Sequence, residues 1–328
     1  MGHSLCSKRA CVIKIAVLCA TRRGLLFLEK LHALVPSAEL LVFSFKEEPC
    51  EPPFLADIRQ FCSKVNANFY ETKHVDLWRW DDLDLMFCVS WRYMVSASVY
   101  SRPRLGSFVF HDSLLPIYRG FSPTVWAMIN GETRTGVTLF EMTNEVDAGP
   151  IILQVPVAIM PDDYIDKVME KVTQAYLHML EMSLSGLLAG SQVRILNLGS
   201  INDKATYGCK RLPEDNRIDW NWPTRRIYNL IRAVSSPYPG AFTTFEGYKL
   251  IVWHARLIER PRQFVGRVPG RVIEIHPGEG VTVLTGDGSI MLTTVESQDR
   301  LGTLLDLVVM AKKVPANMVL NRLSCTLV

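Results

Sequence analysis

Short continuous apolar runs alternate with segments of helical periodicity over the first two thirds of the chain. Continuous apolar runs predict strands buried on both faces, and apolar residues recurring every three or four positions predict helices. This alternation predicts an α/β fold with a doubly wound, mostly parallel sheet and right-handed crossovers. The predicted strands are 12–19, 40–45, 66–70, 85–89, 105–110, 137–140 and 151–155, and the predicted helices are 25–34, 54–65, 123–130 and 165–188.

The pattern changes beyond residue 200. A helix at 224–234 is followed by short alternating segments separated by glycines, which predict the strands 243–245, 249–255, 270–276, 280–284 and 289–295. Such strands favour a small β-barrel of the oligonucleotide-binding (OB) type. The chain is therefore divided into a flexible tail (1–11), an α/β domain (12–200) and a helix plus OB-like domain (201–328).

Composition excludes several classes of protein. The 328 residues are 48% hydrophobic and 21% charged, which argues against disorder, and the net charge of +3 is too small to indicate nucleic acid by itself. The eight cysteines show no metal-ligand spacing, so we expect reduced thiols, a cytoplasmic location and no metal site. The apolar segment 12–20 is too short to span a membrane. No GxGxxG follows the first strand, which disfavours a nicotinamide enzyme.

Candidate chemistry is concentrated in residues 108–150. His111 ends an apolar strand, and the carboxyl end of a buried parallel strand is where open α/β sheets bind ligands. Ser113-Leu114-Leu115-Pro116 follows as a turn, and Asp147 precedes Ala148-Gly149 in a later loop. An imidazole and a carboxylate together can move protons or stabilise an oxyanion.

The His-x-Ser-Leu-Leu-Pro and Asp-Ala-Gly motifs resemble those of the folate-dependent formyltransferases. Members of that family act on methionyl-tRNA, glycinamide ribonucleotide or amino sugars, and the resemblance covers about residues 12–300. It implies formyl transfer from 10-formyltetrahydrofolate to an amine, with His111 and Asp147 as catalytic residues. It also implies that residues 12–200 form the catalytic domain.

One position departs from the family motif. The family has an asparagine two residues before the histidine, where this chain has Val109, and valine has no hydrogen-bond donor. Loss of one oxyanion donor costs about 100- to 1,000-fold in rate. Three interpretations stay open: a backbone N–H, Asn144 or a protonated Asp112 replaces the amide; the site serves another one-carbon or acyl chemistry; or the protein binds folate or a nucleotide sugar without turnover.

The resemblance also implies where the pterin ring binds, since the family holds it between the segment after the fourth strand and the loop before the aspartate. The side chains of Trp91 and Tyr93 are bulky enough to narrow such a pocket. The implied cofactor contacts are Trp91, Arg92, Tyr93, Met94, Leu115, Glu141, Asn144 and Val146.

The acceptor is inferred from the second domain. The stretches PEDNRIDW (213–220) and PYPGAF (237–242) resemble sugar N-formyltransferases more than the tRNA enzyme, so a nucleotide-linked amino sugar is the expected substrate. Scattered arginines leave methionyl-tRNA as the less favoured alternative. A membrane partner is not expected, and a homodimer stays open. The expected substrate contacts are Ser113, Arg119, Gly120, Trp220 and Tyr238.

Overall fold

The computed structural model describes residues 12–47, 52–190, 204–245, 248–298 and 304–305. The chain forms two compact units, each assembled from separate stretches of sequence. The first unit comprises Met1–Arg119, Gly136–Pro156 and Val172–Thr206, and the second comprises Gly120–Thr135, Val157–Lys171 and Tyr207–Val328. The tail 1–11 and the expected division at 200/201 lie outside the described residues, so that domain assignment remains a prediction.

A seven-stranded sheet with the order β3-β2-β1-β4-β5-β7-β8 organises the first unit. Strands β1 to β5 run parallel to their neighbours, whereas β7 runs antiparallel to β5. The expected α/β fold with a mostly parallel sheet is therefore confirmed. The strands are β1 (Lys14–Cys19), β2 (Glu39–Ser44), β3 (Asn68–Glu71), β4 (Leu85–Val89), β5 (Ser107–His111), β7 (Arg134–Glu141) and β8 (Ile151–Ala158).

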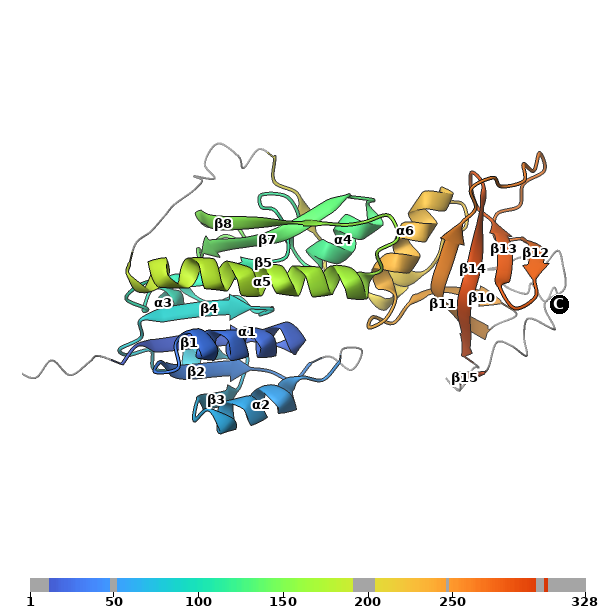
Figure 1. Cartoon of the computed structure of the whole chain (residues 1–328). Helices are drawn as coiled ribbons and strands as arrows, with labels where there is room; N and C mark the ends of the chain where they lie inside the picture. The colour runs from blue at the N-terminus through green and yellow to red at the C-terminus, as the bar shows by residue number, and fades with distance from the viewer. Residues whose placement is uncertain (1–11, 48–51, 191–203, 246–247, 299–303, 306–328) are drawn as a thin grey trace, which may run out of the picture. The chain divides into compact units, whose positions relative to one another are not determined.

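Both faces of this sheet are covered, which explains why its strands are continuous apolar runs. Figure 1 shows α1 (Thr21–Leu34) and α5 (Ile165–Leu188) running along the strands. On that face the ring of Phe110 lies 5.0 Å from Phe27 and 5.4 Å from Tyr176. The opposite face is covered by the segment that includes the short helices η1 (Val75–Leu77) and α3 (Ala97–Tyr100). The helix α2 (Leu55–Lys64) precedes β3.

The second unit contains an antiparallel sheet with the order β10-β11-β14-β13-β12, and β15 pairs with β14. This arrangement is consistent with a small barrel-like domain. The amphipathic α6 (Thr224–Val234) contacts both α4 (Pro123–Ile129) and β11. The strands are β10 (Ala241–Phe245), β11 (Tyr248–Leu257), β12 (Val272–His276), β13 (Gly280–Leu284), β14 (Ser289–Gln298) and β15 (Leu304–Leu305).

The elements that the sequence pattern missed are all short. They are α3, η1, η4 (Pro213–Asn216) and the two-residue strands β6 (Arg119–Gly120), β9 (Tyr207–Gly208) and β15. Elements this short cannot show a helical or alternating period, so periodicity has nothing to detect. Within the described residues, no helix combines the length and the apolar character that crossing a bilayer requires.

Candidate active site

His111 is the last residue of β5, and its side chain is buried. Its Nε2 lies 2.8 Å from the carbonyl oxygen of Tyr118. Because a carbonyl only accepts hydrogen bonds, this nitrogen carries a proton and donates it to Tyr118. The other ring nitrogen, Nδ1, lies 3.6 Å from Oδ2 of Asp147. The two catalytic residues implied by the sequence motif are therefore brought together in the first unit.

Asp147 reaches His111 because the loop between β7 and β8 folds back along β5. In the antiparallel pair, Thr138 lies opposite His111, and Glu141 lies opposite Phe108. The loop thus begins near the amino end of β5, where Met142 N donates to Ser107 O at 2.9 Å. It must return along the strand to place Asp147 beside the histidine.

The glycine of the Asp-Ala-Gly motif has a steric reason. A Cβ at Gly149 would lie 1.7 Å from the carbonyl oxygen of Glu141, so only glycine permits this close approach of the two loop ends. Glu141 N also donates to Pro150 O at 3.0 Å. The glycine of the motif is therefore required by the fold of the loop that carries the Asp147 carboxylate.

Protonation of the site is confined to one atom of the imidazole. Since Nε2 is committed to Tyr118, only Nδ1 can gain or lose a proton, and it faces the Asp147 carboxylate. The 3.6 Å separation is longer than a hydrogen bond, so the two groups are neighbours that are not directly hydrogen-bonded. Nδ1 can accept a proton from an attacking amine, and the imidazolium can stabilise a developing oxyanion.

Both partners of His111 have unusual backbone conformations. Tyr118 and Asp147 have φ values of 58° and 50°, in the left-handed region, which non-glycine residues seldom adopt. Thr21 after β1 and Ser90 after β4 share this conformation, with φ of 66° and 56°. Strained residues of this kind persist where surrounding structure holds them, and they concentrate at functional sites.

Val109 lies on the same face of β5 as His111, since alternate strand residues share a face. It is partly buried and packs against Leu115, Phe140 and Ile151. It also packs against the apolar cluster that includes Cys88 and Val95. The position at which the family motif has asparagine is therefore occupied in this chain by an apolar side chain with apolar neighbours.

Asp112 does not fit the suggested role of replacement donor. Its side chain is on the opposite face of β5, where Nη1 of Arg23 lies 2.7 Å from both carboxylate oxygens and the hydroxyl of Tyr176 donates to Oδ1. Burial raises the pKa of Asp112, but the Arg23 charge and the hydrogen bonds from Tyr176 and Arg23 outweigh it, and the net pKa is lowered. The group is an anion and can only accept hydrogen bonds.

The lowered pKa of Asp112 makes its contribution to stability depend on pH. The ionised form is favoured in the folded state, so the stabilisation is present above the ordinary value of 3.8 and is lost as pH falls through the lower folded-state pKa. We expect Asp112→Asn to lower the free energy of unfolding by about 3 kcal/mol at neutral pH, and by progressively less in acid. Urea unfolding over this pH range measures the difference; a constant difference would contradict the expectation.

The expected folate segment follows β4 and packs on the end of β2. The ring of Phe45 lies 5.3 Å from Trp91 and 4.9 Å from Tyr93, and the guanidinium of Arg92 lies 5.5 Å over it. Met94 is exposed. The indole nitrogen of Trp91 is buried, with no hydrogen-bond partner in the part of the chain that the structure describes. Aromatic walls with an orphaned donor suit a flat heteroaromatic ligand such as a pterin.

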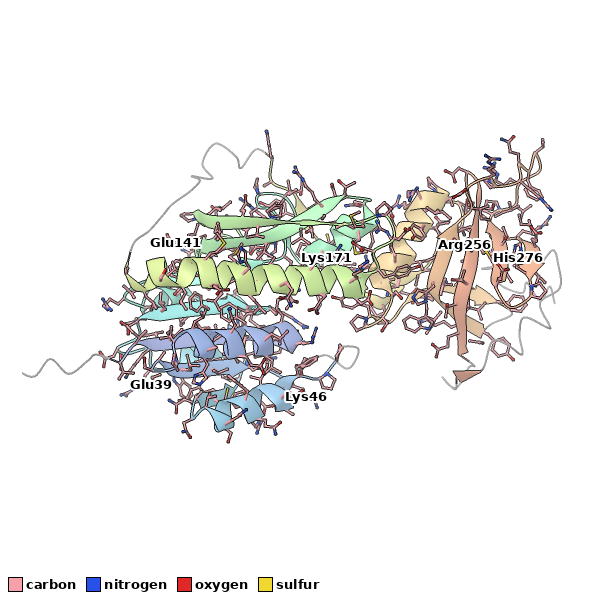
Figure 2. The ribbon with its side chains drawn as sticks, viewed as in Figure 1. Glu39, Lys46, Glu141, Lys171, Arg256 and His276 are labelled. Atoms are coloured by element: carbon pink, nitrogen blue, oxygen red, sulfur yellow. The ribbon has the colours of Figure 1, made fainter. Side chains whose placement is uncertain are left out.

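The other expected cofactor residues differ in what they can offer. Glu141 ends β7 and is labelled in Figure 2. In the loop beyond it, Asn144 accepts a hydrogen bond from the Tyr100 hydroxyl at 2.8 Å, and Val146 is exposed. Leu115 is buried and both its backbone groups are bonded, to Thr138 at 3.1 Å and Gln154 at 2.9 Å. Leu115 can therefore contribute only an apolar wall.

Two of the expected substrate contacts have structural roles instead. Ser113 is 1% exposed, and its hydroxyl donates to Ile117 O at 2.7 Å, which closes the turn. Trp220 is 3% exposed, and its indole donates to Thr243 at 3.1 Å within the core of the second unit. Neither side chain presents a surface to a ligand, because backbone and core contacts occupy it.

The remaining substrate contacts stay predictions. Arg119 is buried in the first unit, and its backbone N donates to Thr206 O at 2.8 Å. Gly120 and Tyr238 belong to the second unit. No group of three histidine, cysteine or acidic side chains placed to hold a metal ion occurs among the residues described.

Sequence inspection missed the residues that hold the two sides of β5. Arg23 lies between the predicted strand 12–19 and the predicted helix 25–34, and Tyr176 lies within the predicted helix 165–188, so neither is singled out. Strand alternation alone predicts that Asp112 faces away from His111, but no local pattern identifies its partners. The role of the Tyr118 carbonyl has no side-chain signal at all.

Comparisons with known proteins agree with this architecture. The formyl transferase family model matches residues 35–182, and the model of the formyl transferase C-terminal domain matches residues 211–302. Together the two models cover most of the chain.

Solved structures share the fold at low sequence identity. The sugar 3N-formyl transferase WlaRD is similar with a TM-score of 0.64 and 18% identity, over 86% of this chain and 97% of that one. The N-formyltransferase from Helicobacter canadensis has a TM-score of 0.64 and 16% identity, over 86% and 100%. HypX from Aquifex aeolicus has a TM-score of 0.59 and 18% identity, over 93% of this chain but only 49% of its own length. The two family models show that this chain belongs to the formyl transferase family of enzymes.

Proposed function

We propose that the protein transfers a formyl group from 10-formyltetrahydrofolate to the amine of a nucleotide-linked amino sugar. The observation that carries the proposal is the approach of His111 Nδ1 to the Asp147 carboxylate, 3.6 Å apart, in a chain of the formyl transferase family.

Structures of similar proteins support the ligand classes. WlaRD was crystallised in the presence of dTDP and 5-N-formyl-THF, and the Helicobacter canadensis enzyme in complex with folinic acid and dTDP-3-aminofucose. HypX was crystallised in complex with tetrahydrofolic acid. These observations support folate as the donor and a nucleotide sugar as the acceptor.

Some residues of the site transfer protons, and others bind the donor. The folate donor supplies the formyl group. Tyr118 holds Nε2 of His111, so proton exchange with the amine takes place at Nδ1. Asp147 stabilises the imidazolium that results. The segments 91–94 and 141–146 supply the walls that hold the donor and keep water from the reacting carbon.

Two alternatives rest on specific observations. The apolar packing of Val109 favours a site that binds folate without formyl transfer, or that serves another acyl chemistry. The second alternative, methionyl-tRNA as acceptor, would use the arginines of the second unit. Two of these have acidic neighbours: Arg256 lies 3.6 Å from Glu279, and Arg262 lies 3.9 Å from Glu274. Arg256 is labelled in Figure 2. These acidic partners reduce the positive charge available to phosphates.

A turnover assay separates these alternatives. Purified full-length protein is incubated with 10-formyltetrahydrofolate and, in separate reactions, dTDP-linked amino sugars, free amino sugars or methionyl-tRNA. We expect release of tetrahydrofolate and formation of an N-formyl product, identified by mass spectrometry, only with the nucleotide sugars. Turnover with methionyl-tRNA alone would replace the proposed acceptor. Folate binding by calorimetry without turnover on any amine would overturn the enzymatic proposal.

A further inference from the structure

Behind His111, on the helix-covered face of the sheet, lies a buried ionic cluster that the proposed mechanism does not use. It joins Arg23 of α1, Asp112 at the end of β5 and Tyr176 of α5. Nη1 of Arg23 lies 2.7 Å from both oxygens of Asp112, and the Tyr176 hydroxyl donates to Oδ1. We call these three residues the β5 anchor.

The β5 anchor is costly to bury, which indicates a specific role. Arg23 is 6% exposed and Tyr176 is 1% exposed. Apolar residues of similar volume often stabilise a core as well as a buried ion pair does. The guanidinium also lies 4.6 Å from the centre of the Tyr176 ring, so charge, hydrogen bonding and cation–π contact converge on one carboxylate.

The anchor fixes the backbone from which His111 projects. Asp112 follows His111 directly, and the Tyr176 hydroxyl lies 3.0 Å from the carbonyl oxygen of Phe110, the residue before it. Because the hydroxyl has a single proton, which it donates to Asp112, Asp112 is tied to both α5 and α1, and the Phe110 carbonyl lies close to the same hydroxyl. On the other face, Tyr118 and Asp147 contact the two ring nitrogens.

We propose that Arg23, Asp112 and Tyr176 are positioning residues for His111, which hold the end of β5 in place and balance the charge behind the imidazole. This inference rests on the proposed formyl transfer, because it assigns the residues a role in that reaction. The family motif does not specify such a cluster, since it leaves the position after the histidine undefined.

The charges around His111 determine the direction of each effect. The charged and titratable groups that the described contacts place around it are Asp147 from the β7–β8 loop, Asp112 from β5, Arg23 from α1 and Tyr176 from α5. Asp112→Asn removes a negative charge and leaves the Arg23 cation, which disfavours the imidazolium. Arg23→Gln leaves the Asp112 anion uncompensated, which favours it. Tyr176→Phe changes neither charge.

The test compares Asp112→Asn, Arg23→Gln and Tyr176→Phe with a matched control, Asp84→Asn. Asp84 is also a buried carboxylate, and it bonds Lys14 N at 2.9 Å and Arg104 at 2.8 Å. It precedes β4, which is the parallel neighbour of β5, so Asp84 lies at the amino end of these strands and His111 at their carboxyl end. The Asp84 variant thus loses a carboxylate of the same sheet that also pairs with an arginine, although the Arg104 side chain is 67% exposed whereas that of Arg23 is 6% exposed.

Two readouts are measured on each folded variant at a temperature below its unfolding transition. For the three anchor variants we expect kcat to fall about 10- to 100-fold, with less than about a threefold change in KM, because misplacement of a catalytic group affects the reaction more than binding. We expect the Asp84 variant to retain wild-type kcat. The second readout is the pH midpoint of the His111 ring signals in NMR, which needs no substrate.

The NMR midpoint distinguishes failure of this inference from failure of the proposed function. We expect the midpoint to fall in Asp112→Asn, to rise in Arg23→Gln and to stay unchanged in Tyr176→Phe and Asp84→Asn. The inference would be overturned if the midpoints of the Asp112 and Arg23 variants shifted in the same direction. It would also be overturned if neither shifted further than the midpoint of the Asp84 control. An inactive wild-type protein with the expected midpoint shifts would overturn the formyl transfer proposal and the kinetic role, but not the charge coupling.

Discussion

Replacing His111 with alanine is expected to lower kcat for formyl transfer by about 100- to 10,000-fold, the usual contribution of a general acid–base residue. The imidazole is the group whose Nδ1 faces Asp147, and its Nε2 is already committed to Tyr118. Alanine removes both the proton acceptor and the positive charge. Initial rates of tetrahydrofolate release, at saturating donor and acceptor, measure the loss.

A suitable control for this variant is His178→Ala. His178 is an exposed residue of α5, in the same unit as His111. We expect this variant to keep its activity. Loss of the His111 ring leaves the Tyr118 carbonyl without its donor, which costs about 1–3 kcal/mol, so circular dichroism and unfolding curves must show that the variant is folded. Wild-type activity in His111→Ala would disprove the assigned site.

Introducing the motif amide by Val109→Asn is expected to raise the rate of formyl transfer by up to about 100- to 1,000-fold, the effect of one oxyanion donor. Val109 is two residues before His111, so an amide there projects from the same face of β5. The increase is expected if the natural reaction is formyl transfer with a weaker substitute donor. The measurement is kcat with 10-formyltetrahydrofolate and the accepted nucleotide sugar.

The outcome of Val109→Asn also tests the alternative chemistries. If the site serves a different acyl reaction, the amide should reduce that native reaction. Burial of an amide among Leu115, Phe140 and Ile151 costs about 1–3 kcal/mol if it finds no partner. Val109→Thr is the matched control, because it adds a polar atom of similar size without the reach of an amide. Equal rates in the two variants would argue against oxyanion stabilisation from this position.

Asn144 is the surviving side-chain candidate for the missing donor, because Asp112 is committed to Arg23 and Tyr176. The oxygen of Asn144 accepts from Tyr100 at 2.8 Å, which orients the carboxamide and leaves its nitrogen as the donor. A backbone N–H remains the other interpretation. Sequence spacing alone placed both residues near the motif, and strand alternation predicts only that Asp112 faces away from His111; it says nothing of Asn144, which lies in the loop after β7.

The strands and helices were largely predictable from the chain itself, because burial on both faces or on one helical face leaves a repeating local pattern. Segments 85–89 and 165–188 match β4 and α5 residue for residue. The position of His111 at the end of β5 follows from the same pattern. The antiparallel direction of β7 did not, since direction depends on how a connection crosses the sheet and not on the strand's own residues.

The amino-acid sequence by itself determined the sheet-forming segments, the position of His111 at a strand end and the family motif that contains His111 and Asp147. Only the tertiary structure decided that the β7–β8 loop folds back over Val109, and that Asp112 pairs with residues 89 and 64 positions away in sequence. The physical reason is that local periodicity records whether a side chain is buried. The identity of its partner depends on which distant elements pack against the same face.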